Sequence, residues 1–525
     1  MKNILKYTFA LLAIGFVSCE PEFDSPVTDD GFYTSGTANL SKYVSVGNSL
    51  TAGYADGALY ITGQKNSYPN IMAQQFAFAG GGEFYQPLMN DNIGGLLLGG
   101  AQIAENRLVL AVDANGNPGP VRLEGTPTTD VSNKLSGSFN NMGVPGAKSF
   151  HLVAPGYGNV AGVPTGAANP YFARFASSES ATVIGDAAAQ NPTFFSLWIG
   201  NNDILSYATS GGVGVDQTGN LDPSTYGSND ITDPNVFASV YSQMVDALTA
   251  GGAKGVLINI PEVTSIPFFT TVPFAPLSPL NPDFGPQIPA LNAQYALLNQ
   301  AFAYLGVPER SIQFSMSGPS AVVVQDESLV DISAQLTQVL IGGGLDVPTA
   351  TIFGLQYGQA RQATSSDLLV LTSSSVIGTL NSDRLAQLIA MGVPQEQAAQ
   401  LSVNGITYPM QDQWVLIPAE QQSISTAAAS YNATIETLAG AKGLAFVDAR
   451  AALARVANGG IAYDGGVLTS QFVTGGAFSL DGVHPTPRGY AYTANLIIRA
   501  INETYDATIP TVHIGNYATV TLANN

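Results

Sequence analysis

The residue types needed for nucleophilic catalysis occur at two distant places in this chain. Ser49 lies in the motif GNSL, directly after the apolar run 43–46. A serine hydroxyl is a weak nucleophile until a base removes its proton, and a turn at a strand end exposes it beside a helix N-terminus. Asp481 and His484 lie three residues apart in the motif DGVHP. His484 can serve as the base, and Asp481 can orient and stabilise its imidazolium.

The number of histidines limits which residue could be that base. The chain has 3 histidines, at positions 151, 484 and 513. His513 lies near the C-terminus and has no acidic residue shortly before it, and His151 lies in a loop rich in glycine and proline. We therefore expect His484 to be the base and His151 to be structural or close to the substrate.

Apolar runs end directly before several of the polar motifs. They lie at about 43–46, 139–142, 194–199, 256–260 and 444–447, and such near-continuous runs are typical of parallel strands buried on both faces. Helical patterns separate them at about 67–78, 235–250 and 419–441, and a last helix is expected to begin at Thr486-Pro487. The alternation predicts an α/β fold with a doubly wound parallel sheet, which binds ligands beyond the carboxyl ends of its strands.

Four motifs in this order resemble the sequence blocks of the SGNH hydrolases, also called GDSL esterases and lipases. The motifs are GNSL at 47–50, NMGVPG at 141–146, GNND at 200–203 and DGVHP at 481–485. The resemblance implies a three-layer, flavodoxin-like sheet and the catalytic residues Ser49, Asp481 and His484. It also implies an oxyanion hole formed by the Ser49 and Gly146 backbone N–H groups and the Asn202 side-chain amide.

One position departs from the family pattern. Asn48 stands where the family has Asp before the nucleophile. That Asp is not the acid of the triad, so the departure concerns hydrogen bonding around the nucleophile turn. No cofactor is required for this chemistry, and no histidine lies among acidic residues in a pattern that predicts a metal site.

Composition excludes several functional classes. The chain has 525 residues, 11% of them charged, and a formal net charge of −20. This charge argues against a nucleic-acid binder, which would need a basic face. A single cysteine, Cys19, excludes a disulfide framework and a Cys-based zinc site.

The N-terminus is typical of an exported lipoprotein. Lys2 and Lys6 precede the apolar run 7–17, which is too short to span a bilayer as a helix. Cys19 follows at once, and Ser18-Cys19 resembles the lipobox of bacterial lipoproteins, where the cysteine is acylated. Loss of residues 1–18 would remove the two lysines and take the net charge from −20 to −22. We expect lipid anchoring to a bacterial membrane, with the outer membrane as the expected location.

These observations predict one catalytic domain with large insertions. We expect a signal peptide at 1–18, a lipidated N-terminus and tether at 19–40, a hydrolase domain at 41–503 and a C-terminal tail at 504–525. The stretches 79–137 and 262–418 are too long for simple crossovers and are expected to be insertions.

The predicted function is hydrolysis of carboxylic esters through an acyl-enzyme, as in a lipase, esterase or lysophospholipase. A polysaccharide O-acetyl esterase is the alternative within this class, and a non-catalytic surface binding lipoprotein is the alternative from another class. The expected partners are a small-molecule or lipid ester and the membrane that holds the anchor, with no nucleic acid. The sequence does not predict the oligomeric state.

Overall fold

The computed structural model describes residues 32–112 and 116–523, and its centre is a five-stranded parallel sheet. The strands lie in the order β13-β8-β7-β1-β6, so the sheet is built in both directions from β1. All five coincide with predicted apolar runs to within a few residues. Their bounds are β1 (Tyr43–Gly47), β6 (Asn141–Gly143), β7 (Phe194–Trp198), β8 (Lys254–Ile258) and β13 (Ala445–Val447).

The register brings the carboxyl ends of the first three strands to one edge. Gly47 of β1 pairs with Gly143 of β6 and with Trp198 of β7. Every residue of β1 and β7 is buried, as parallel strands covered on both faces require. The predicted motifs that follow these strands therefore lie together at this edge.

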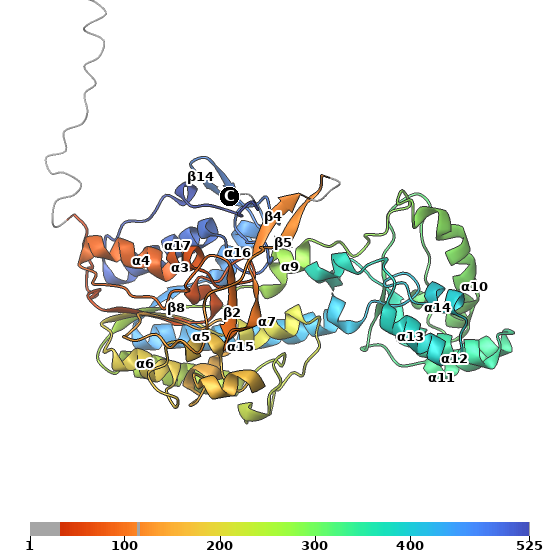
Figure 1. The fold of residues 1–525 in the computed structure, drawn as a ribbon, viewed down its shortest axis with the longest axis horizontal. Helices are drawn as coiled ribbons and strands as arrows, with labels where there is room; N and C mark the ends of the chain where they lie inside the picture. The colour runs from red at the N-terminus through yellow and green to blue at the C-terminus, as the bar shows by residue number, and fades with distance from the viewer. Residues whose placement is uncertain (1–31, 113–115, 524–525) are drawn as a thin grey trace, which may run out of the picture.

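Helices cover both faces of the sheet. Helices α4 (Tyr68–Phe76) and α17 (Pro487–Tyr505) pack together, and Figure 1 shows them on one side of the sheet. On the other side lie α6 (Val183–Ala189) and α15 (Pro418–Lys442), with α8 (Pro234–Thr249) packed against both. The predicted helices at 67–78, 235–250 and 419–441 and the one from Thr486 are thus present. The shorter helices of this part are α2 (Ser49–Ala52), α3 (Ile61–Lys65), α5 (Pro170–Ala173), α7 (Asn202–Thr209) and α16 (Ala449–Ala457).

The stretch 79–137 forms two hairpins outside the main sheet. Strands β2 (Gly94–Leu98) and β3 (Ala101–Asn106) pair with each other, as do β4 (Leu108–Val112) and β5 (Pro118–Arg122). A separate two-stranded pair, β14 (Ile461–Tyr463) and β15 (Gly466–Leu468), lies before the last helix.

The stretch 262–418 forms a subdomain with its own hydrophobic core. Buried residues such as Tyr295, Phe302 and Leu336 pack with each other and form a cluster distinct from the one around the sheet. Figure 1 shows α10 to α14 as a lobe to one side of the main body. Its elements are α10 (Ile288–Tyr304), α11 (Ser333–Gly342), α12 (Val347–Tyr357), α13 (Ser382–Ala390), α14 (Gln395–Gln400), β9 (Val323–Gln325), β10 (Ala360–Gln362), β11 (Leu368–Leu369) and β12 (Val415–Leu416). The short helix α9 (Pro267–Thr270) precedes the lobe and packs into the core around the sheet through Phe269.

The first described residues and the C-terminal tail pack against each other. The Thr34 backbone N–H donates to Thr508 Oγ1 over 2.9 Å, and the Thr508 N–H donates back to the Thr34 carbonyl. Tail residues Ile509 and Ile514 are buried. The last part of the predicted tether and the predicted tail thus form one edge of the folded body.

Candidate active site

Ser49, His484 and Asp481 form one hydrogen-bonded chain. Ser49 Oγ lies 2.9 Å from His484 Nε2, although the two residues are 435 positions apart. His484 Nδ1 lies 2.8 Å from Asp481 Oδ2. This is the geometry in which an imidazole can take the proton of a serine while a carboxylate stabilises the resulting cation.

The Asp481 carboxylate accepts hydrogen bonds from several sides. Its Oδ1 accepts the backbone N–H groups of Val483 and His484, at 2.9 and 2.8 Å. Its Oδ2 also accepts the Gly57 N–H at 2.9 Å. Burial by itself would raise the pKa of Asp481, but the neighbouring His484 and these hydrogen bonds lower it to about 2. Asp481 is therefore ionised at any pH at which an imidazole can act as a base.

The loop that follows helix α2 holds the segment around Asp481 in place. Asp56 has φ +54°, a left-handed conformation that is uncommon for a residue with a side chain. Its Oδ1 accepts the Leu480 N–H at 3.1 Å, and its own N–H donates to Ser479 Oγ at 2.9 Å. Together with the Gly57 bond, these contacts fix the loop that carries His484 against the loop that follows Ser49.

Ser49, the predicted nucleophile, occupies the first position of helix α2. Asn48 caps this helix, because its Oδ1 accepts the Leu50 N–H at 3.1 Å. The Asn48 amide Nδ2 donates to Asn201 Oδ1 at 3.2 Å, which ties the nucleophile turn to the loop after β7. Asn48 thus satisfies its amide in both directions although it is fully buried.

The three expected oxyanion donors lie on segments that are bonded to one another. The Val144 N–H donates to the Gly47 carbonyl, and Asn202 Nδ2 donates to the Ala147 carbonyl at 2.9 Å. Ser49, as the first residue of α2, has an N–H with no partner inside the helix. Gly146 has φ +80°, and a side chain there would lie in open space with a single atom within 4.0 Å. Its glycine is therefore required by backbone conformation, and its exposed N–H can approach a substrate.

A buried carboxylate fixes the loop that carries Gly146. Asp203, at the start of α7, is fully buried and accepts the Ser149 N–H at 2.8 Å and the Ser149 hydroxyl at 2.6 Å. Because Asn202 and Asp203 are adjacent, both bonds to the loop come from the same turn of helix. Sequence reasoning did not identify Asp203, Ser149 or Asp56 as functional, although Asp203 lies within the GNND motif.

The two other histidines lie outside this arrangement. The His151 ring stacks on Tyr157 with a centroid distance of 4.6 Å, and its Nδ1 accepts the Lys148 N–H. Burial, with a smaller contribution from Lys148, lowers the pKa of His151 to about 4. His513 precedes a short helical turn in the tail. Neither one contacts Ser49.

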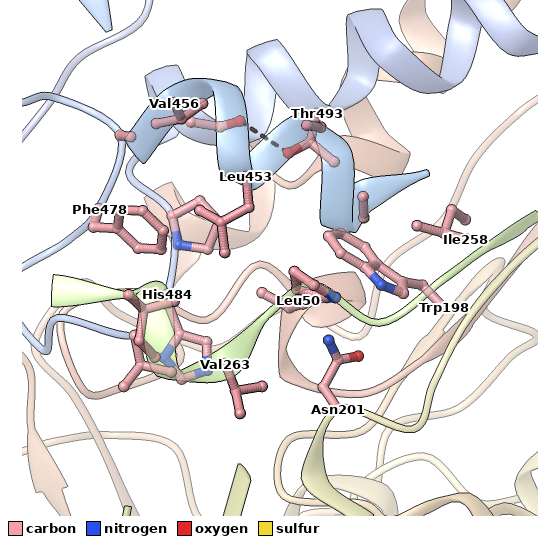
Figure 2. Close-up of a pocket in the computed structure, with 18 of the residues that line it drawn as sticks. Leu50, Trp198, Asn201, Ile258, Val263, Leu453, Val456, Phe478, His484 and Thr493 are labelled. Atoms are coloured by element: carbon pink, nitrogen blue, oxygen red, sulfur yellow. Dashed lines mark hydrogen bonds between the residues drawn. The ribbon is translucent and has the colours of Figure 1, made fainter. Parts of the chain in front are cut away.

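A pocket of about 120 Å³ opens beside Ser49 and His484. Ser49, Asn202 and His484 contribute to its wall, and most of the remaining lining is apolar. Figure 2 shows His484 and Asn201 on one side of this pocket, Val456 and Thr493 on the opposite side, and Leu453 between them. Helix α16, which supplies Leu453 and Val456, was not among the predicted helices.

A cluster of three carboxylates lies away from the triad, where the subdomain meets the main body. Glu327, Asp412 and Glu420 each place an oxygen within 4.8 Å of the other two. Burial and the neighbouring carboxylates raise the pKa of Asp412 and of Glu420 above the ordinary values. Glu420 also caps α15, since its Oε2 accepts the Ile417 N–H at 2.7 Å. The three carboxylates of this cluster are too far apart in the sequence to be recognised as a motif.

No family model matches this chain, and no curated protein or solved structure was found to be similar to it. Among residues 32–112 and 116–523, no helix has the length and apolar character needed to cross a membrane. Cys19 and the predicted signal peptide lie outside the described residues.

Proposed function

We propose that this protein is a serine hydrolase of the SGNH type that cleaves carboxylic esters through an acyl-enzyme. The observation that carries the proposal is the continuous path from Ser49 Oγ through His484 to Asp481, with distances of 2.9 and 2.8 Å. The strand order, which in chain order reads 2-1-3-4-5, is that of flavodoxin-like sheets, and the site lies at the carboxyl edge where such sheets bind ligands.

The proposed reaction has two steps. In the first, Ser49 Oγ attacks the ester carbonyl carbon, His484 Nε2 takes the serine proton, and the collapse of the tetrahedral intermediate expels the alcohol, which receives that proton. In the second, water gives a proton to His484 and attacks the acyl carbonyl carbon. The tetrahedral intermediate then releases the carboxylic acid, and His484 returns the proton to Ser49 Oγ. The Ser49 and Gly146 N–H groups and the Asn202 amide stabilise the negative oxygen in both steps.

The same catalytic residues would serve an O-acetyl esterase of polysaccharides. An acetyl group is too small to need the apolar pocket beside Ser49, so the pocket favours esters with a longer acyl chain. A binding lipoprotein without activity would gain nothing from a base within hydrogen-bonding distance of a serine hydroxyl.

Labelling with an alkyl fluorophosphonate tests the proposed activity. We expect stoichiometric modification at Ser49, none in Ser49→Ala and much slower modification in His484→Ala. Ser178→Ala, which changes an exposed serine, is the matched control and should label like the wild type. A folded wild-type protein that does not label would support the binding lipoprotein.

We also propose that the protein is exported and anchored through acylated Cys19, on the basis of the N-terminal sequence. The anchor would hold the enzyme at a bacterial membrane, where lipid esters and cell-surface esters are both within reach.

A further inference from the structure

In the pocket beside Ser49, the wall opposite the catalytic residues is formed by apolar side chains. This wall comes from α16 and α17, through Leu453, Val456 and Leu496, and the base of the pocket includes Ile258 at the end of β8. Leu453 is 9% exposed and Val456 4%, so these side chains are packed into the protein and present little surface to solvent. Figure 2 shows these helices opposite His484.

His484 is the one acidic or basic side chain among the described residues that line the pocket. Among the described residues, no Asp, Glu, Lys or Arg side chain lines it. A phosphate or a carboxylate placed there would lose its hydration without gaining a partner. An alkyl chain would lose only contact with water, which is favourable by roughly 25 cal/mol per Å² of apolar surface buried.

We propose that this pocket binds the acyl chain of the substrate, and that the substrates are esters of medium-chain, unbranched fatty acids. This inference rests on the proposed hydrolase function. The size limit follows from the volume: an engineered cavity of about 150 Å³ in another protein holds the six carbons of benzene, so about 120 Å³ accommodates about five carbons, the number that follow the carbonyl carbon in a six-carbon acyl group. Longer chains would have to displace side chains of α16.

The acyl half of the ester fits this pocket better than the alcohol half. The acyl group stays bonded to Ser49 after the first step, whereas the alcohol must leave before water can attack. An alcohol whose alkyl chain lay beside Leu453 and Val456 would have to leave past the acyl-enzyme.

Helix α16 sets the depth of the pocket in this arrangement. Two small side chains of this helix, Ala449 and Ala452, line the pocket together with Leu453 and Val456. A larger residue at 452 would fill the deep part, and a smaller one at 453 would lengthen it. Ala454 lies on the exposed side of the same helix and provides a control position.

The test measures kcat/KM for p-nitrophenyl esters with acyl chains of 2 to 12 carbons, using the purified full-length protein. For the wild type we expect an increase of about fourfold per methylene up to about six carbons, and no further increase beyond that. Ala452→Leu should lower kcat/KM for the hexanoate at least tenfold and leave the acetate within twofold. Leu453→Ala should shift the preferred chain to greater length, and Ala454→Leu should match the wild type.

A second series separates the two halves of the ester. Acetates of straight-chain alcohols with 2 to 8 carbons should show little dependence on the length of the alcohol. A strong dependence there, with a flat acyl series, would overturn the proposal by assigning the alcohol to the pocket. A protein that reacts with the fluorophosphonate but shows no chain-length preference would also overturn it, and would leave the hydrolase function intact.

Equal loss for acetate and hexanoate in a folded Ala452→Leu variant would show that this position supports the site and does not limit the chain. A wild-type protein that neither labels nor hydrolyses any ester would refute the hydrolase function itself.

Discussion

Replacing Asp481 by Asn should lower kcat by about four orders of magnitude while the protein remains folded. The change keeps the size of the side chain and exchanges one carboxylate oxygen for an amide nitrogen. Its effect depends on which of the two oxygens the nitrogen replaces, and the hydrogen bonds around Asp481 decide this.

Every polar neighbour of the Asp481 carboxylate is a hydrogen-bond donor or can act as one. Oδ1 accepts the N–H groups of Val483 and His484 and the Ser479 hydroxyl, at 2.9, 2.8 and 3.1 Å. Oδ2 accepts the Gly57 N–H at 2.9 Å and contacts His484 Nδ1 at 2.8 Å. An amide nitrogen at the Oδ1 position would oppose two backbone N–H groups, and at the Oδ2 position only one. The nitrogen should therefore face the His484 ring.

With the amide nitrogen in this orientation, the His484 imidazole is held in the tautomer that cannot act as a base towards Ser49. His484 Nδ1 must then accept a hydrogen bond, so the ring proton resides on Nε2, the atom 2.9 Å from Ser49 Oγ. A protonated Nε2 cannot take the serine proton. Four orders of magnitude correspond to about 5 kcal/mol of lost transition-state stabilisation.

Steady-state kinetics with a p-nitrophenyl ester measures this effect. KM should change little, because substrate binding does not involve Asp481, and thermal unfolding should show that the variant is folded. Asp464→Asn, which changes an exposed carboxylate in the β14–β15 hairpin, is the control and should retain full activity. A folded Asp481→Asn variant with kcat within tenfold of the wild type would refute the assignment of Asp481.

Four further outcomes are expected. Asn202→Ala should lower kcat by roughly two to three orders of magnitude with a small change in KM, and a change confined to KM would instead indicate a role in substrate binding. Ser149→Ala should reduce the free energy of unfolding by about 1–3 kcal/mol and lower kcat, because Asp203 loses a donor and the Gly146 loop is less firmly held. Denaturant titration measures the first effect and steady-state kinetics the second. An unchanged kcat would show that the loop does not depend on this bond. The pKa of Asp481 is lowered from 3.8 to about 2 in the folded protein, so its stabilising contribution is complete above pH 4 and is lost as the pH falls towards 2. The difference in unfolding free energy between the wild type and Asp481→Asn should therefore shrink by about 2 kcal/mol between pH 5 and pH 2. A constant difference would contradict the lowered pKa. Cys19→Ser should release active enzyme from the membrane fraction, as measured by fractionation and mass spectrometry of the N-terminus, and unchanged membrane association would exclude a lipid anchor at this residue.

The main sheet was predictable because its strands are buried on both faces. A run such as Phe194–Trp198 can be recognised without its partners, since every residue in it is buried. The close approach of Asp481 and His484 was also foreseeable, because they lie three residues apart in one turn. The two hairpins of 79–137 gave no such signal, since β3 and β5 are largely exposed and follow no apolar alternation.

Contacts between distant segments could not be predicted. The bonds from Asp56 and Gly57 to the segment 479–481 join positions more than 420 residues apart, and no local pattern encodes them. Helix α16 could have been found, because Asp448 is a suitable N-cap and does accept the Ala451 N–H. Its role in the pocket depends on where it lies relative to α17, which also lines the pocket, and the sequence alone does not specify this.

The lobe of residues 262–418 is joined to the sheet at two neighbouring points. It leaves after β8 and returns at α15, and the Asn432 side chain of α15 holds both the N–H and the carbonyl of Ile260 at the point of departure. No residue between 267 and 446 lines the pocket beside Ser49. Val263 and Ile266, at the start of the segment, do line it. Exchange of residues 267–418 by recombination would therefore change the lobe and leave every residue that lines this pocket in place.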